Sequence, residues 1–197
     1  MARKTRRTKP HEITYQTLGE ICDLISSADK LVRVAQLTVA QLQAKMGLKG
    51  CALMLLNRRT RQLEMAASEG LSQSYLSKGP LSASKSIADS LKEGPVAIFD
   101  VRDDPRLQYP EEARREGIAS ILSVPLVLRG RPLGVLRLYT AEPWEFTLAD
   151  VNSVQAVALI LALVLDGLRV AGAYKTSVEA LKVLRPASTP RKRTLHE

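Results

Sequence analysis

The sequence of 197 residues has few of the side chains that most enzymes use for catalysis. Its two histidines, His11 and His196, both lie close to the ends of the chain. Catalysis by a histidine in the folded core is therefore excluded, and any general acid or base must be Asp or Glu. Cys22 and Cys51 are far apart and form no CxxC pair. This usage is typical of a reducing compartment and offers no disulfide framework.

Long apolar runs are missing as well. The basic N-terminus is followed by mixed residues at 11–16 instead of an apolar h-region, so we expect no signal peptide. The most apolar stretch, residues 154–165, is 12 residues long and contains Gln155. A membrane span needs roughly 20 residues. We therefore expect a cytoplasmic protein that has no membrane partner.

The formal charge of +9 is concentrated in two tails. Residues 1–9 carry +5 and residues 185–197 carry +3, which leaves +1 for residues 10–184. Basic arms can bind nucleic acid by counterion release, and a regulator of that kind is one alternative. No recognition helix or aromatic-rich basic face accompanies the tails. We therefore expect disordered basic tails at residues 1–11 and 186–197, and no nucleic-acid partner.

Residues 118–139, IASILSVPLVLRGRPLGVLRLY, predict an antiparallel β-hairpin. Two β-rich runs flank a short connection that is centred on Gly130. Pro125 cannot donate to a strand ladder, so we expect a bulge or a partly unpaired position there. Gly134 has no side chain, which allows another group to pack close to its backbone.

Hydrophobic periodicity predicts the remaining elements. Apolar residues at three- and four-residue steps indicate helices over residues 13–28 and 31–46. Ser27 or Asp29 would cap the second helix, and Gly47 would end it. The other predicted elements are strands at 51–56, 62–68 and 96–99, a loop at 70–82, and helices at 84–91 and 110–116.

The last predicted helix begins at Thr147, where Asp150 completes a near capping box. It is apolar nearly all round between residues 154 and 165, so both of its sides need cover. The same helix from a second copy is the most economical cover, and we expect a homodimer. The helix would run to about residue 185, where Pro186 stops it. The expected interface residues are Ile21, Ile25, Val154, Leu161, Leu165 and Leu168.

The order of these elements and a set of short motifs resemble the GAF domain family. The motifs are DV at 100–101, DPR at 104–106, GIASILSVPL at 117–126, GVL at 134–136 and WEFT at 144–147. The resemblance covers residues 28–168. It implies an α+β fold, with an antiparallel sheet of five to six strands and helices on both faces. It also divides the chain into an N-terminal helix at 12–28, a GAF domain at 29–170 and a helical extension at 171–185.

The resemblance implies a sensor or signalling module without intrinsic catalysis. A small molecule would bind on one face of the sheet, under residues 84–91 and 100–116, and the terminal helices would pack on the other face. We expect no output domain after Pro186, so the chain would act by binding a signalling protein. As an alternative, the pocket is vestigial and the domain is a dimerisation unit. The candidate pocket residues are Tyr75, Asp100, Arg102, Asp103, Arg106, Tyr109, Ser120 and Ser123. As an alternative, Asp100 and Asp104 form turns only.

The subclasses of the family with a known ligand do not match, so the ligand and any cofactor stay unidentified. Cyclic-nucleotide-binding members carry an Asn-Lys-Phe-Asp-Glu set that is missing here, and bilin- and haem-binding members need a pocket histidine. Free methionine sulfoxide reductases use cysteines from pocket loops, whereas Cys22 lies on a predicted helix and Cys51 on a predicted strand. A redox enzyme working through Cys51 is the enzymatic alternative to a buried structural thiol. We expect no metal site.

Overall fold

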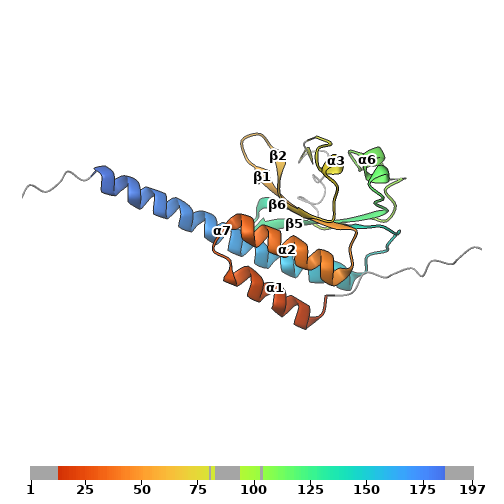
Figure 1. Ribbon diagram of the computed structural model, residues 1–197, viewed down its shortest axis with the longest axis horizontal. Helices are drawn as coiled ribbons and strands as arrows, with labels where there is room; N and C mark the ends of the chain where they lie inside the picture. The colour runs from red at the N-terminus through yellow and green to blue at the C-terminus, as the bar shows by residue number, and fades with distance from the viewer. Residues whose placement is uncertain (1–12, 80, 83–93, 103, 185–197) are drawn as a thin grey trace, which may run out of the picture.

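The computed structural model describes residues 13–79, 81–82, 94–102 and 104–184. The predicted tails and the helix predicted over residues 84–91 lie outside the described residues. A six-stranded sheet separates two groups of helices (Figure 1). Its order is β3-β2-β1-β6-β5-β4, and every neighbouring pair is antiparallel. The predicted α+β class and strand number are confirmed.

The strands are β1 (Gly50–Asn57), β2 (Gln62–Glu69), β3 (Leu81–Ser82), β4 (Val96–Ile98), β5 (Ser120–Leu128) and β6 (Arg131–Thr140). The helices are α1 (Tyr15–Ser27), α2 (Leu31–Met46), α3 (Gln73–Leu76), α6 (Pro110–Arg115) and α7 (Leu148–Leu184). The loop predicted over residues 70–82 is wrong in part, since it contains α3 and β3. Ser72 caps α3 by accepting a hydrogen bond from the Tyr75 amide at 3.2 Å.

The β5–β6 hairpin forms as predicted, but its bulge does not lie at Pro125. Pro125 pairs in register with Val135, and the shift follows between Leu126 and Val127, which leaves Leu133 without an opposite residue. β4 pairs only with residues 121–123 of β5. Among the described residues, no strand pairs with this side of β5 at Pro125, and such an edge position tolerates the missing N–H.

Gly134 allows β1 and β6 to approach one another closely. A Cβ atom at Gly134 would lie 2.1 Å from the carbonyl oxygen of Met54 and 3.0 Å from the Cα of Leu55. The group that packs against this glycine is thus the backbone of the neighbouring strand.

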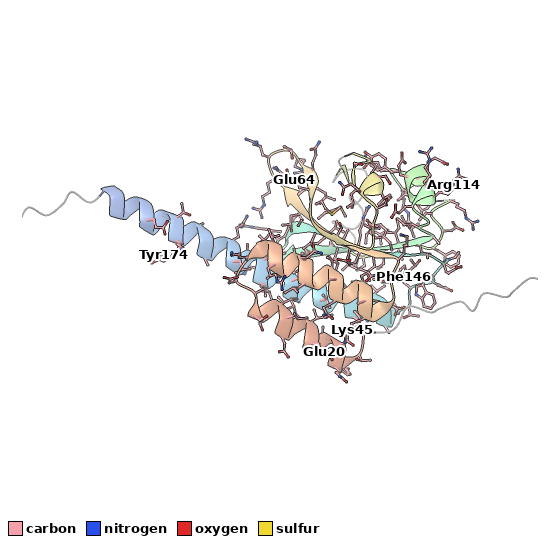
Figure 2. The ribbon with its side chains drawn as sticks, viewed as in Figure 1. Glu20, Lys45, Glu64, Arg114, Phe146 and Tyr174 are labelled. Carbon is pink, nitrogen blue, oxygen red and sulfur yellow. The ribbon has the colours of Figure 1, made fainter. Side chains whose placement is uncertain are left out.

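The helices α2 and α7 pack on one face of the sheet, and α1 packs outside them (Figure 1). The strands contribute alternate apolar side chains to this core, among them Cys51, Leu53, Leu122, Val124, Leu126, Leu136 and Leu138. An ion pair between Glu20 of α1 and Lys45 of α2, at 2.6 Å, joins α1 to α2 (Figure 2).

Five of the six residues assigned to a dimer interface belong to this intrachain core. Ile21, Ile25, Val154, Leu161 and Leu165 are at most 4% exposed, and Leu168 packs at the margin. The sheet and the chain's own first two helices supply the cover that the sequence assigns to a second copy. These five buried side chains cannot also face another chain. Among the residues of α7 whose burial the structure describes, the exposed large apolar ones are Leu148, Leu159, Leu163, Val170 and Tyr174.

The α7 helix is a single element of 37 residues that crosses the predicted boundary at residue 170. Its capping box is confirmed. The Thr147 amide donates to Asp150 Oδ2 at 2.9 Å, and the Asp150 amide donates to Thr147 Oγ1 at 3.1 Å. Gly47 ends α2 at φ 63° as predicted, but Lys30 occupies the N-cap without a side-chain hydrogen bond, so neither Ser27 nor Asp29 caps it.

The C-terminal part of α7 projects beyond the body, and residues 169–177 are exposed (Figure 1). By length and composition alone, the segment Leu148–Ser177 is apolar enough to cross a membrane, so the apolar stretch exceeds the 12 residues noted above. The buried share of its most apolar window is 28%. Those buried side chains pack on the sheet.

Candidate functional site

The face of the sheet opposite α2 and α7, here called the covered face, lies beneath α3 and α6 (Figure 1). Two tyrosines lie at its centre. The rings of Tyr75 and Tyr139 meet edge to face at 85°, with centroids 6.0 Å apart. Burial raises the pKa of both phenols, so each hydroxyl stays protonated and can donate a hydrogen bond.

Arg137 brings a positive charge into this face. It is 3% exposed and opposes Ala52 on β1 and Ser123 on β5. Because side chains alternate along β6, it shares the covered face with Val135 and Tyr139. Arg137 also hydrogen-bonds the Tyr139 side chain, which opposes the effect of burial on the pKa of that tyrosine.

Lys78, after α3, adds a second cation to the covered face. Its Nζ donates to the Tyr75 carbonyl oxygen at 2.9 Å and lies 3.5 Å from the centroid of the Tyr75 ring. Burial, reinforced by the charge of Arg137, lowers the pKa of Lys78 to about 8. Both groups therefore carry positive charge at neutral pH, and they lie close enough to interact.

The nearby carboxylates only partly offset these charges. Glu112 and Glu116 act on Lys78 in the opposite sense to Arg137. Glu116, however, is engaged elsewhere, because it accepts hydrogen bonds from the Ser72 amide at 2.8 Å and from Lys49 Nζ at 3.4 Å. The covered face thus favours a negatively charged ligand.

A cleft of about 260 Å³ opens beside Lys78. It lies between α3 and the β1–β2 strand pair, and its walls are mainly apolar. Its lining residues are Met54, Leu63, Met65, Leu76, Ser77, Lys78 and Gly79.

In the loop at residues 100–106, which was predicted to bind the ligand, the aspartates pair with arginines of the same loop. Asp100 accepts hydrogen bonds from the Arg102 amide at 3.0 Å and from Arg102 Nε at 2.9 Å. The bonds from the Arg102 side chain lower the pKa of Asp100 to about 2. Asp104 accepts the equivalent pair from Arg106 at 2.9 and 2.8 Å. These contacts are the turns of the alternative prediction; Asp103 lies outside the described residues.

The remaining predicted residues divide between structure and site. Ser120 Oγ donates to the Phe99 carbonyl and accepts from the Trp144 amide at 2.7 Å, so it ties β5 to two loops. Tyr109 is the N-cap residue of α6 and packs beside the cluster of Met54, Leu63 and Val135. Of the eight candidates, Tyr75, Tyr109 and Ser123 therefore lie on the covered face with Arg137.

Sequence reasoning missed Arg137 and Lys78. The signal for Arg137 was available, because it is a charged residue between Leu136 and Leu138 in a strand otherwise rich in apolar residues. Because successive side chains in a strand point to opposite faces, Arg137 must point to the other face of the sheet from those leucines. Lys78 carries no such signal, since its place depends on how α3 folds back over the sheet.

The thiol of Cys51 is not on the covered face. Cys51 belongs to the core under α2 and α7, is 0% exposed, and has its pKa raised by burial. Cys22 is half-buried on α1, and both cysteines are free. Among the described residues, no group of His, Cys, Asp and Glu could hold a metal ion.

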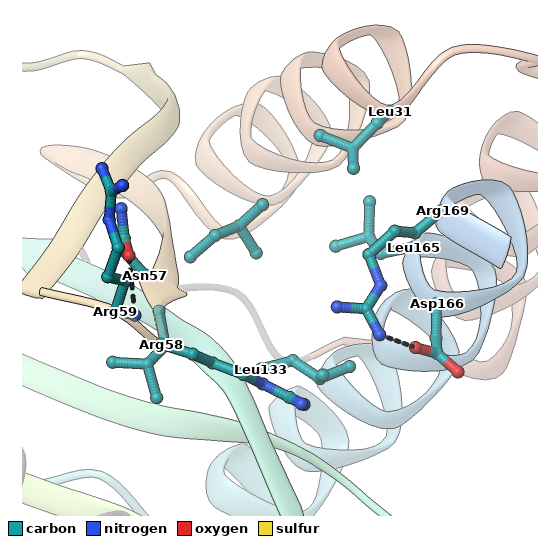
Figure 3. Close-up of a pocket in the computed structure, with 10 residues that line it drawn as sticks. Leu31, Asn57, Arg58, Arg59, Leu133, Leu165, Asp166 and Arg169 are labelled. Carbon is teal, nitrogen blue, oxygen red and sulfur yellow. Dashed lines mark hydrogen bonds and ion pairs between the residues drawn. The ribbon is translucent and has the colours of Figure 1, made fainter. Parts of the chain in front are cut away.

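A second hollow, here called the arginine cleft, lies on the helix side of the sheet (Figure 3). Its volume is about 330 Å³, and it is enclosed by the start of α2, the β1–β2 turn, β6 and α7. The lining residues are Leu31, Leu55, Leu56, Asn57, Arg58, Arg59, Leu133, Leu165, Asp166 and Arg169.

Solved structures similar to this chain are bacterial GAF domains. The GAF domain of a phosphoenolpyruvate-protein phosphotransferase from Coxiella burnetii is 21% identical, with a TM-score of 0.72 over 80% of this chain and 95% of that one. The corresponding Acinetobacter domain is 25% identical, with a TM-score of 0.69 over 79% and 93%.

A free methionine-R-sulfoxide reductase from Neisseria meningitidis, solved with its substrate, is 22% identical. Its TM-score is 0.69 over 79% of this chain and 89% of that one. A comparison with curated proteins finds no match. The family model described as "GAF domain" matches residues 28–166, which is more than half of the sequence. The chain therefore belongs to the GAF domain family.

Proposed function

We propose that this GAF domain is a signalling sensor that binds a small anionic molecule on the covered face of its sheet. The observation that carries the proposal is the pairing of Arg137 with Lys78. A buried guanidinium and a half-buried ammonium share one face, although burying either charge costs free energy. A bound carboxylate or phosphate would offset that cost through charge-assisted hydrogen bonds.

The polar neighbours fit the same ligand class. The hydroxyls of Tyr75, Tyr139 and Ser123 lie on the face with the two cations and can donate to an oxyanion. The rings of the tyrosines would also present apolar edges to the body of the ligand. A ligand held there would contact β6, whose opposite side carries the core that packs against α7.

A thermal-shift screen with small carboxylates and phosphates tests this proposal. A ligand of the native state raises the melting temperature by mass action, and Arg137→Met should abolish that rise. Lys78→Met should reduce it without the folding risk of the Arg137 change. Arg115→Ala, an exposed arginine on α6, is the control and should keep the rise. A rise that survives in both Met variants would contradict the assignment.

We also propose that the protein acts without catalysis and resides in the cytoplasm. Free cysteines fit a reducing compartment. Thiol chemistry through Cys51 is disfavoured by its complete burial and raised pKa. Alkylation of Cys51 slower than that of a free peptide thiol at pH 7 is expected. Faster alkylation would instead favour the reductase alternative.

The output of the sensor is proposed to pass through α7 to a second copy or to a signalling protein. The exposed apolar residues Leu159, Leu163 and Val170 follow steps of four and seven along α7, as in a helix–helix seam. Light scattering should show a dimer at micromolar concentration that Leu163→Glu weakens. Val32→Glu, on an exposed valine of α2, is the matched control. A monomer at micromolar concentration would contradict self-association.

A further inference from the structure

The arginine cleft lies on the opposite side of the sheet from the covered face, where α7 leaves the body. Leu31, Leu55 and Leu165, from α2, β1 and α7, are among the apolar side chains that line it (Figure 3). Its volume of about 330 Å³ is within the range of small-molecule sites. The cleft is therefore large enough for the apolar part of a small ligand.

The bulge in β6 adds to the apolar lining. Leu133 has no opposite residue on β5. Strict alternation from Leu136 and Leu138 would turn Leu133 to the covered face, but the bulge shifts this alternation by one residue. Leu133 accordingly packs against the helix-side core and lines the cleft. Bulges commonly re-aim a side chain in this way next to functional sites.

Arginines from two tight turns and from α7 surround this lining. Arg58 and Arg59 lie in the β1–β2 turn, where Asn57 Oδ1 accepts hydrogen bonds from the amides of Arg59 at 3.0 Å and Thr60 at 3.2 Å. This side-chain bonding fixes the turn. Arg58 and Arg169 reach toward the middle of the cleft from opposite walls (Figure 3).

A neighbouring cleft of about 350 Å³ continues the site and adds two more arginines. It shares Arg58 and Arg169 with the first cleft and is also lined by Arg129 and Arg131. Arg129, at φ 51°, and Gly130, at φ 71°, form the two-residue turn of the β5–β6 hairpin. Arg129 thus lies in the turn itself, and Arg131 begins β6 directly after it.

The positive charge around the cleft is only slightly neutralised. Asp166 is the one carboxylate among the lining residues, and it pairs with Arg169 at 3.3 Å. Within the part of the chain that the structure describes, Arg58, Arg59, Arg129 and Arg131 form no ion pair with a carboxylate. Three guanidinium groups border the apolar cleft itself, and five border the two clefts together. This arrangement fits a ligand with one anionic group and an apolar body.

We propose that the arginine cleft is a second binding site, for a small amphipathic anion. Arg58 and Arg169 hold its phosphate or carboxylate, and Leu31, Leu133 and Leu165 receive its apolar part. The site is independent of the ligand proposed for the covered face, because the sheet lies between them. A ligand here contacts α7 at the point where the helix leaves the body.

Calorimetric titration of the full chain with octyl phosphate, below its micelle concentration, tests the site. We expect saturable binding of one molecule per chain. Octyltrimethylammonium, which has the same tail and the opposite charge, should not bind. Inorganic phosphate should bind at least about tenfold more weakly, since it buries no methylene groups.

The variants locate the probe. Arg58→Ala and Arg169→Ala should each weaken octyl phosphate about tenfold, as expected for the loss of one hydrogen bond between charged groups. Arg115→Ala on α6 should leave the affinity unchanged. Octyl phosphate that keeps its affinity in both cleft variants would overturn the proposal. So would equal binding of octyltrimethylammonium, or a complete lack of saturable binding.

A membrane surface is the competing explanation for the arginines. Sedimentation with phosphatidylglycerol vesicles separates the two, because a surface needs no defined cleft. Vesicle binding that depends on Arg58 and Arg169, without saturable binding of monomeric octyl phosphate, would assign these residues to lipid headgroups and overturn the proposal. Saturable octyl phosphate binding lost in the same variants supports it.

Discussion

The two faces of the sheet differ in what they bury, although both are built from the same strands. Leu136 and Arg137 are neighbours on β6, and both are at most 3% exposed. Leu136 points into the apolar core beneath α2 and α7. Arg137 points to the covered face, where Lys78, Tyr75 and Ser123 supply polar groups. The covered face has apolar clusters as well, but unlike the face under α2 and α7 it also buries a charged side chain.

This difference between the faces is the physical basis of the proposed binding site. Burying a charge costs free energy unless a partner compensates it, whereas an apolar side chain at the same position costs none. The two cations on one face therefore support the proposed anionic ligand.

Truncation of a core residue on the helix face should have the largest effect. Leu136→Ala removes a fully buried side chain between α7 and its neighbouring strands, and the expected loss of unfolding free energy is about 2–5 kcal/mol. Chemical denaturation measures it. Ser123→Ala, equally buried on the covered face, should cost about 1 kcal/mol or less in the absence of ligand. Equal losses in the two variants would contradict the division between the faces.

The second prediction concerns pH, through Lys78. In the folded protein Lys78 releases its proton near pH 8, whereas in the unfolded chain it holds the proton to about pH 10.4. Between these values the unfolded state binds more protons, so stability rises with pH across this window. Because Lys78 is only half-buried, solvent screening reduces the gain below the full value of the pKa difference, to on the order of 2 kcal/mol.

Lys78→Met isolates this contribution. The variant should be more stable than the parent at pH 7, and the difference should shrink as the pH approaches 10. Urea denaturation at pH 7, 8.5 and 10 provides the measurement, with Lys30→Met, on an exposed lysine, as the control. A difference that stays constant over this range would place Lys78 in solvent and would weaken the case for a charged pocket.

Much of the fold could be predicted because the signals are local. The turn at Gly130, the αL end of α2 at Gly47 and the capping box at Thr147 each depend on a few adjacent residues. The antiparallel pairing of β5 and β6 also followed from the two apolar runs. The prediction of a bulge at Pro125 was wrong. Whether a proline disrupts a strand depends on whether a neighbouring strand needs its N–H, and here that depends on the length of β4, which no local pattern predicts.

The partners of α7 could not be predicted for a related reason. An apolar helix shows that it needs cover on several sides, but the pattern does not say which chain supplies it. α1 and α2 cover the sides that a second copy was expected to cover, and Ile21 and Val154 are buried within one chain. The pattern of charges at Asp100 and Asp104 likewise did not show what they bind. Each carboxylate accepts hydrogen bonds from the arginine two residues later.

The smallest predicted effect concerns the projecting end of α7, which belongs to neither face. Gly172 is exposed, and a Cβ atom there would meet nothing within 4 Å. Gly172→Ala should therefore stabilise this part of the helix by up to about 1 kcal/mol through helix propensity alone. Hydrogen exchange of the amides around residue 172 should slow, while the global unfolding free energy stays unchanged. If the global value rises as well, the projecting segment unfolds together with the body, and a ligand on either side of the sheet could act on it directly.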